Sequence, residues 1–325
     1  MRSIKKGETA MLPQSHKIMS DFQVRKSKKQ KEAFRSWLCG ELEAAGYAPK
    51  VEKGFAARNV VAGDPDTAEI ILSAHYDTCA VLPVPNFITP RNMFFYACYQ
   101  LLLVIPLFLA ITAVEFALVF AEIALGAEGE LWWLAPTVSM ALCIFFLWWI
   151  LDGKSNRHTA NDNTSGVITL VETALAMPEA DREKVCFVFF DNEEKGLFGS
   201  AAFTKAHKKA KKKTLNINFD CVSDGDYVQF FPGKPLKKDG EALDRIEEAF
   251  TGRGGKKTEV VRGFGFYPSD NRAFRRGVGV CALKHKRIVG YYMDRIHTNK
   301  DTVLEEENIL LLRDGALRLV HMTTE

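Results

Sequence analysis

Residues 188–200, VFFDNEEKGLFGS, hold the feature from which the fold can be worked out. The apolar run KVCFVFF, residues 184–190, has the length and composition of a buried strand, and it stops at Asp191. Two adjacent glutamates, Glu193 and Glu194, follow. Because neighbouring like charges repel each other, something else must compensate two carboxylates at the end of a buried strand. The rest of the chain has to supply the partners.

Apolar runs typical of strands alternate with helical runs on both sides of this stretch. Further strands are predicted at 58–63, 68–78, 214–220, 227–233, 258–263 and 277–283. Helices are predicted at 27–46, 165–177, 198–212, 241–250, directly after 274, and from 304 onwards. This alternation predicts an α/β fold with a mostly parallel central sheet and helices on both faces.

Two long apolar segments, 93–125 and 131–151, interrupt that pattern. The only charged residues from 93 to 151 are Glu115, Glu122, Glu128 and Glu130. A helix needs about 20 apolar residues to cross a bilayer core of roughly 30 Å. The second segment has paired tryptophans at each end, as expected at membrane interfaces. The two apolar segments together predict a transmembrane helical hairpin within 91–151. The alternative is a buried helical pair in a soluble core.

The charges that flank the hairpin predict its orientation. Arg91 precedes it, Lys154 and Arg157 follow it, and the link between the two helices carries only acidic residues. Basic residues stay on the cytoplasmic side of a membrane, so both large flanking regions are expected there. The N-terminal residues contain no apolar core typical of a signal peptide. We therefore expect an integral membrane protein whose globular part is cytoplasmic.

The hairpin divides the globular part in the sequence. Residues 1–90 and 152–325 are expected to form one discontinuous domain, with 1–26 flexible. The lipid bilayer is an expected partner through residues 93–151. The net charge of +3 gives no support for a nucleic-acid partner, and we expect none. The lysine-rich run at 205–213 is read as a solvated helix face, with attraction to anionic lipid as the alternative.

Side chains able to bind a metal recur where the predicted strands end. These are His75, Asp77, Asp162, Glu193, Glu194, Asp220, His297 and Asp301. In open α/β sheets, ligands bind at the carboxyl ends of the strands, so these side chains are expected to share one edge of the sheet. The seven cysteines form no CxxC pair, which argues against a cysteine-based zinc site.

The residue types fit a pair of zinc ions. Two ions about 3.5–4 Å apart can hold both the attacking and the leaving oxygen of a hydrolysis. His75 and His297 would supply imidazoles, and Asp162, Asp220 and one glutamate would supply carboxylates. Asp77, two residues after His75, can accept the second ring N–H and fix the tautomer.

The glutamate doublet then has an explanation. Successive side chains at a strand end point in different directions, so one carboxylate can bind metal while the other faces the reacting water. The carboxylate without metal can act as a general base and pass the proton to the leaving amine. The nearby cations offset the repulsion between the two glutamates. The doublet predicts a metal-dependent hydrolase.

Five motifs carry a resemblance to a known family. They are AHYDT (74–78), ANDNTSG (160–166), DNEEKGLFGS (191–200), NFD (218–220) and HTNKDT (297–302). In this order they resemble the zinc exopeptidases of metallopeptidase family 28, which include bacterial leucyl aminopeptidase and aminopeptidase Y. The resemblance covers about residues 55–325 without the hairpin. Members usually have a short loop where this chain has the hairpin.

The resemblance implies a role for each ligand position. His75 and Asp220 would hold one zinc, Glu194 and His297 the other, with Asp162 bridging and Glu193 as general base. It also implies a cis peptide bond after Asp162. Cobalt or manganese could replace zinc. The implied activity is removal of N-terminal residues from peptides.

The resemblance also suggests residues that contact substrate. Ser269 and Asp270 match a family segment beside the substrate pocket, and Tyr291 or Tyr292 would polarise the scissile carbonyl. The stretch GFGFYPSD, residues 263–270, offers aromatic side chains either for an apolar pocket or for the core. The hairpin is expected to bring the site close to the membrane surface.

Two alternatives stay open. Glutaminyl cyclases resemble this family but use one zinc and catalyse an intramolecular attack on an amide. A non-catalytic membrane scaffold could also keep a peptidase fold, although such proteins usually lose ligands or the base. All six expected ligand and base residues are present here, which favours the two-metal hydrolase.

Overall fold

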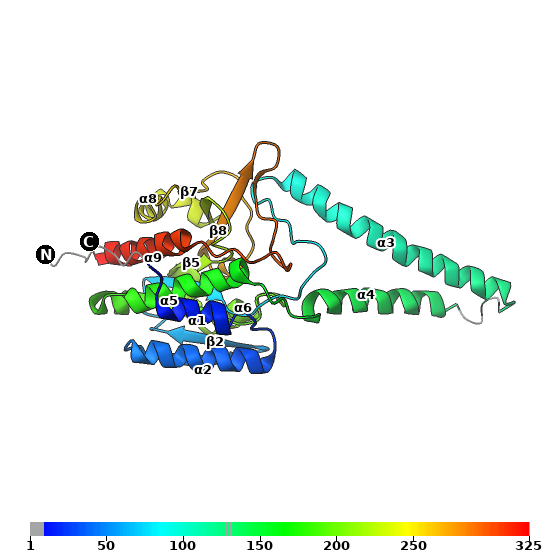
Figure 1. Ribbon diagram of the computed structural model, residues 1–325, viewed down its shortest axis with the longest axis horizontal. Helices are drawn as coiled ribbons and strands as arrows, with labels where there is room; N and C mark the ends of the chain where they lie inside the picture. The colour runs from blue at the N-terminus through cyan, green and yellow to red at the C-terminus, as the bar shows by residue number, and fades with distance from the viewer. Residues whose placement is uncertain (1–9, 128, 130–131, 325) are drawn as a thin grey trace.

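A computed structural model describes residues 10–127, 129 and 132–324. Its centre is a nine-stranded sheet in the order β1-β2-β4-β3-β5-β8-β6-β7, with β9 paired to β8 (Figure 1). The strands are β1 (Lys50–Gly54), β2 (Ala57–Ala62), β3 (Ile70–His75), β4 (Val185–Phe190), β5 (Leu215–Phe219), β6 (Tyr227–Pro232), β7 (Lys257–Val260), β8 (Arg276–Lys286) and β9 (Gly290–Tyr292).

The four central strands, β4, β3, β5 and β8, run parallel to one another. Antiparallel pairings flank them: β1 with β2, β2 with β4, β8 with β6 and β8 with β9. Every residue of β3, β4 and β5 is buried, as expected for strands covered on both faces. The predicted α/β class and the parallel centre are confirmed.

Helices cover both faces of the sheet, and alternate strand residues serve the two faces. Ile70 and Leu72 pack in the large core with α1 (Pro13–Asp21), α2 (Lys28–Ala44), α5 (Gly166–Ala176), α8 (Gly240–Ala249) and α9 (Glu306–His321). Ile71 packs on the opposite face with Phe203 and Ala210, from α6 (Phe198–Ala206) and α7 (Lys208–Lys213). Figure 1 shows α1, α5 and α9 together on one side of the sheet.

The two apolar segments form α3 (Met93–Ala124) and α4 (Leu134–Asp152), which project together from the sheet domain (Figure 1). Their most apolar windows have mean hydropathies of 2.5 and 2.1 and are 0% and 6% buried. Both are therefore long and apolar enough to cross a membrane. Their exposure contradicts the alternative of a helical pair buried in the core of this chain.

Three local expectations need comment. The stretch 1–26 was expected to be flexible; residues 1–9 lie outside the described residues, and in the remainder α1 buries Ile18 completely. No α-helix begins directly after residue 274, where one was expected: a 3₁₀ turn, η4 (Asp270–Ala273), precedes it, and β8 begins at Arg276, which pairs with Leu215 of β5. Pairing in the sheet overrides the local helical preference there. The single helix predicted at 198–212 is two helices, α6 and α7, joined at His207.

The lysine-rich run lies far from the hairpin along the sheet. α7 leads into the N-terminal end of β5. The hairpin, in contrast, follows the C-terminal end of β3. Because β3 and β5 are parallel, these two points are at opposite edges of the sheet. The topology therefore favours the solvated-face interpretation of the run over contact with the membrane that the hairpin would cross.

Candidate metal centre

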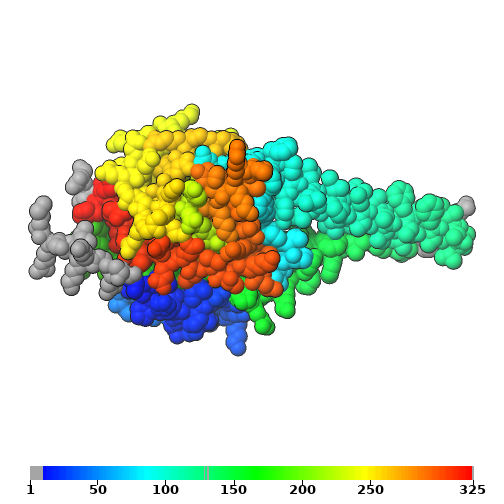
Figure 2. All heavy atoms as spheres, turned by 45° about the horizontal axis from the view of Figure 1, so that its top comes forward, coloured from blue at the N-terminus to red at the C-terminus, as the bar shows by residue number. Residues whose placement is uncertain are grey.

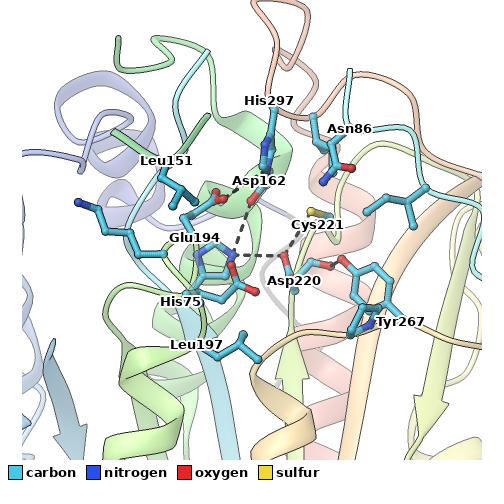
Figure 3. Close-up of a pocket in the computed structure, with 16 residues that line it drawn as sticks. His75, Asn86, Leu151, Asp162, Glu194, Leu197, Asp220, Cys221, Tyr267 and His297 are labelled. Atoms are coloured by element: carbon cyan, nitrogen blue, oxygen red, sulfur yellow. Dashed lines mark hydrogen bonds and ion pairs between the residues drawn. The ribbon is translucent and has the colours of Figure 1, made fainter. Parts of the chain in front are cut away.

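A cavity of about 380 Å³ lies at the carboxyl ends of the central strands. The ends of β3, β4 and β5 contribute to its lining, together with the loops before α5 and α9. Six residues expected to bind metal or act as base line it: His75, Asp162, Glu193, Glu194, Asp220 and His297. Figure 3 shows the side chains of His75, Asp162, Glu194, Asp220 and His297 converging from different elements.

The first half of the cluster is centred on His75. Its Nε2 atom lies 3.5 Å from Oδ1 of Asp162 and 3.4 Å from Oδ1 of Asp220 (Figure 3). All three residues are buried, and their ligand atoms lie within 4.8 Å of one another. Burial opposes protonation of His75, but the charge of Glu193 and the carboxylate of Asp220 raise its pKa well above the usual value.

The second half is centred on His297. Its Nε2 atom lies 3.0 Å from Oδ2 of Asp162 and 3.3 Å from Oε2 of Glu194. Asp162 therefore directs one carboxylate oxygen to each half of the cluster. Cys79, which the sequence reasoning did not single out, completes a second group with Asp162, Glu194 and His297, whose ligand atoms also lie within 4.8 Å of one another. The sequence offered one signal for this role of Cys79, its position four residues after His75.

These donors fit divalent metal ions. Oε1 of Glu194 is buried and has no hydrogen-bond partner among the described residues. Burial and the charge of Asp162 raise the pKa of Glu194 to about 8, and the pKa of His297 reaches about 9 because nearby carboxylates outweigh its burial. Imidazole and carboxylate are ligands that zinc prefers, and a cation would satisfy the unpaired oxygen and the crowded charges.

The two glutamates of the doublet have different surroundings. Burial raises the pKa of Glu193 well above its usual value; the charge of His75 counteracts this, while Asp220 and Asp270 add to it. Glu194 lies 3.3 Å from Nε2 of His297 and belongs to a group of candidate ligands, whereas Glu193 belongs to neither group. That one carboxylate binds metal while the other faces the water stays a prediction.

Asp77 contacts both His75 and the glutamate doublet. Its carboxylate lies 3.6 Å from Nδ1 of His75, an ion-pair distance, and its backbone carbonyl lies 3.1 Å from that nitrogen. The carboxylate also accepts hydrogen bonds from the backbone N–H groups of Glu193 and Glu194. Asp77 does not line the cavity, and its expected role in fixing the His75 tautomer stays a prediction.

The loop that carries Asp162 is held from two sides. Asp301 accepts hydrogen bonds from the backbone N–H groups of Asn161, at 2.7 Å, and of Asp162, at 3.0 Å. The side chain of Asn163 donates to the backbone carbonyl of Phe219 at 3.0 Å. The peptide bond between Asp162 and Asn163 is cis, as the resemblance implied.

Arg25 is a supporting residue that the sequence reasoning missed. Its side chain is completely buried and donates hydrogen bonds to the backbone carbonyls of Tyr76 and Phe22 and to the hydroxyl of Thr164. Burial lowers its pKa to about 10. Arg25 thus connects the chain between His75 and Asp77 to the loop after Asp162. No local sequence pattern indicates these contacts, because Arg25 follows α1, a helix that the sequence did not predict.

Ser269 and Asp270 lie behind the cavity and do not line it. Both are completely buried, and the hydroxyl of Ser269 accepts a hydrogen bond from Asn218 at 3.1 Å. Burial raises the pKa of Asp270 to about 7. Both residues are buried outside the cavity lining, and their contact with substrate stays a prediction.

Tyr291 and Tyr292 are not among the residues that line this cavity. Tyr291 lies in β9 beneath the guanidinium of Arg91, 4.9 Å from its ring centroid, and the ring of Tyr292 lies 5.7 Å from that of Phe87. The tyrosine at the cavity is Tyr267, whose hydroxyl donates to the backbone carbonyl of Asp220 at 3.1 Å. Tyr291 and Tyr292 lie in β9, which pairs with β8, and not in the lining of the cavity.

The base of the hairpin also lines the cavity. Leu151 comes from the last turn of α4, and Asn86 and Ile88 come from the segment that leads into α3 (Figure 3). Two contacts join α4 to the sheet domain nearby: Lys26 donates to the backbone carbonyl of Leu151 at 2.5 Å, and Asp152 forms an ion pair with Lys195. The cavity and the two apolar helices are therefore adjacent.

The fold and the cluster define the class of zinc-peptidase-like α/β proteins, and the comparison with family models is more specific. The model of peptidase family M28 matches residues 151–314, and the chain belongs to this family. No curated protein sequence shows significant similarity to the chain.

Solved structures share the fold at low sequence identity. A Zn-dependent exopeptidase from Parabacteroides distasonis superimposes with a TM-score of 0.58 at 14% identity, covering 94% of each chain. The glutaminyl cyclase of Porphyromonas gingivalis gives a TM-score of 0.58 at 14% identity, covering 95% of this chain and 96% of the cyclase. The LapA aminopeptidase of Legionella pneumophila gives 0.55 at 13% identity, covering 94% of this chain and 69% of LapA.

Proposed function

We propose that the protein is a membrane-anchored metallopeptidase with two zinc ions that removes N-terminal residues from peptides. The observation that carries this proposal is the position of Asp162, whose two carboxylate oxygens face His75 and His297 respectively. His75 and Asp220 would hold one ion, Glu194 and His297 the other, and Asp162 would bridge them. When bound, the two ions would supply Lewis acidity to the water and to the scissile carbonyl.

Glu193 is the proposed general base. It lines the cavity without belonging to either group of candidate ligands, so its carboxylate is available to the reacting water. Burial raises the pKa of Glu193, so its carboxylate, when ionised, is a stronger base toward water than an exposed glutamate and can return the proton to the leaving amine. The hydrogen bond that its backbone N–H donates to the Asp77 carboxylate keeps it oriented.

The size of the cavity supports an exopeptidase. A volume of about 380 Å³ holds one or two residues of a peptide, whereas cleavage within a chain needs an open groove on both sides. Tyr267, Leu197 and Ile296 provide apolar lining for a side chain. Aminopeptidase action is proposed by analogy with the family, since metal ligands alone do not distinguish the two ends of a peptide.

A panel of aminoacyl anilides tests the activity. Detergent-purified wild-type protein is compared with Glu193→Gln, with bound metal quantified in each. Activity in the wild type and a loss of about 10²–10⁴-fold in the variant, with about two metals retained in both, supports the proposal. Loss of metal from Glu193→Gln would contradict the assignment of Glu193 as base, because it would make Glu193 a ligand.

Glutaminyl cyclase is a second candidate, because cyclases are among the proteins that share this fold. It predicts one metal ion per chain and formation of pyroglutamate from peptides with N-terminal glutamine. The same purified protein, tested with a glutaminyl peptide by mass spectrometry, separates the two. Loss of ammonia from the intact peptide favours the cyclase; release of free glutamine favours the peptidase.

The proposed anchor is the pair α3 and α4, with residues 1–90 and 152–325 as one discontinuous cytoplasmic domain. The exposure and hydropathy of both helices support it, as do the basic residues at both flanks. Protease added to right-side-out and inverted membrane vesicles tests this. The proposal requires the sheet domain to be cleaved only in inverted vesicles; cleavage in right-side-out vesicles would reverse the orientation.

We further propose that the substrates are short peptides at the membrane surface. Leu151, Asn86 and Ile88 line the candidate metal centre from the base of the hairpin, so a substrate would enter beside the bilayer. Deleting residues 93–151 and joining the flanks tests this. Selective loss of activity on bilayer-bound peptides is expected, with activity on soluble peptides kept; equal activity on both would make the hairpin a simple tether.

A further inference from the structure

A second cavity, of about 630 Å³, lies at the base of α3 next to the candidate metal centre. Its apolar lining comes mainly from Met93, Phe231, Phe264, Phe266 and Tyr267. Tyr267 lines both cavities, so its ring separates them. This cavity contains none of the candidate metal ligands and therefore needs a separate explanation.

Basic side chains belong to the lining of this cavity. They are Lys234, Lys237 and Arg272. Within the described part of the chain, none of the three forms an ion pair. We call this cavity, with its three basic residues, the basic groove.

Two arginines close to the groove, unlike the basic residues that line it, form ion pairs with acidic side chains. Arg262 pairs with Asp244, at 2.5 Å, and with Glu247, and Arg276 pairs with Asp239 at 2.8 Å. Buried surroundings lower the pKa of Lys237, whose ammonium contacts only the backbone carbonyl of Gly263 among the described residues. The groove thus carries positive charge that this chain does not compensate.

The groove lies where the hairpin begins. Met93 is the first residue of α3, and the backbone N–H of Phe266 donates to the carbonyl of Pro90 at 2.8 Å. Phe264 and Phe266 are 64% and 42% exposed, and the guanidinium of Arg272 lies 5.3 Å from the ring centroid of Phe266. Figure 2 shows the yellow and orange segments beside the cyan start of the hairpin.

We propose that the basic groove binds one anionic phospholipid of the bilayer, with an acyl chain in the apolar cavity and the phosphate against Lys234, Lys237 and Arg272. The proposal rests on the proposed anchoring of α3 and α4 in a membrane. An apolar cavity with an uncompensated cationic rim at a membrane interface matches both parts of such a lipid. Zwitterionic lipids offer the same chains but no net negative charge.

Native mass spectrometry of the full-length, delipidated protein in detergent tests this, with phosphatidylglycerol and phosphatidylcholine of identical chains as probes. The test variant combines Lys234→Gln, Lys237→Gln and Arg272→Gln. The matched control combines Lys28→Gln, Lys29→Gln and Lys53→Gln, which removes the same charge from exposed lysines that do not line the groove. We expect phosphatidylglycerol affinity to fall at least about tenfold in the test variant and to stay unchanged in the control.

A second variant tests the apolar part without changing charge. Gly233 lines the cavity, and a side chain there meets only ordinary contacts, the nearest being the Gly277 carbonyl at 3.4 Å. Gly233→Phe should fill the cavity and weaken phosphatidylglycerol binding by a similar factor. Unchanged binding in this variant would overturn the placement of the acyl chain, as would glycerol 3-phosphate binding as tightly as the lipid.

Two other results would overturn the proposal: equal affinity for the two lipids, or equal losses in the test and control variants. Thermal melting of each variant shows whether it is folded. Because lipid binding is measured without peptide substrate, failure here leaves the proposed peptidase activity untouched. The vesicle experiment tests the proposed membrane anchor separately.

Discussion

The carboxylate of Asp77 holds the backbone of Glu193: Oδ1 accepts the Glu193 N–H at 3.0 Å, and Oδ2 accepts the Glu194 N–H at 3.2 Å. The strand end that carries His75 thereby fixes the loop that carries the doublet. A positioning role of this kind explains why Asp77 lies next to the cluster without lining the cavity.

Replacing Asp77 should disturb the doublet more than the metals. In Asp77→Asn the amide group can accept only one of the two backbone N–H bonds and turns an NH₂ toward the other. We expect kcat to fall about 10–100-fold, with metal content close to that of the wild type. Steady-state kinetics and metal analysis check this; a variant that loses its metals but is fully active when they are restored would contradict it.

Asp162 should control both metals at once. Asp162→Ala removes the carboxylate that faces both histidines, so we expect metal content to fall from about two ions per chain to none. Glu194→Ala should leave one ion, because His75, Asp162 and Asp220 remain. Elemental analysis after dialysis measures both, with Asp314→Ala, at a partly exposed position on α9, as the control. Similar metal content in Asp162→Ala and Glu194→Ala would exclude a bridging role.

Arg25 should matter for stability as well as for the site. Arg25→Leu leaves the backbone carbonyls of Tyr76 and Phe22 without this donor inside the protein. Each buried acceptor left unpaired costs about 1–3 kcal/mol, so a clearly lower free energy of unfolding is expected. Chemical denaturation measures the change, with Lys29→Ala, on the exposed side of α2, as a neutral control. Equal stability of the two variants would argue against a structural role for Arg25.

Removing metal should destabilise the sheet domain. Without cations, the carboxylates of Asp162, Glu193, Glu194 and Asp220 line one cavity and outnumber the basic residues that line it, His75, Lys195 and His297. A chelator should therefore lower the melting temperature, and zinc at about 100 times its Kd should restore roughly 2.7 kcal/mol. Differential scanning fluorimetry follows both steps, and magnesium at equal concentration serves as the comparison. A melting temperature insensitive to chelator would contradict a bound structural metal pair.

The sequence by itself determined the fold class and the residues that meet at the sheet edge. Strand periodicity, turn residues and the alternation with helices are local, so β3, β4 and β5 could be predicted from short windows. Parallel strands bring their carboxyl ends to one edge, so side chains that follow those strands had to converge. That geometric rule is why His75, Glu193 and Asp220 could be proposed together without coordinates.

Only the tertiary structure decided relations between distant segments. It showed that the Asp77 carboxylate binds the glutamate backbone, brought Cys79 to the cluster, and placed Tyr267, and neither Tyr291 nor Tyr292, in the lining of the cavity. It also put the base of the hairpin against the cavity and the lysine-rich run at the opposite sheet edge. The hydrogen bond between Asp77 and Glu193, for example, joins residues 116 positions apart, and such contacts depend on how loops pack after the sheet has formed. Local composition fixes the strands, whereas packing over such separations depends on the whole chain.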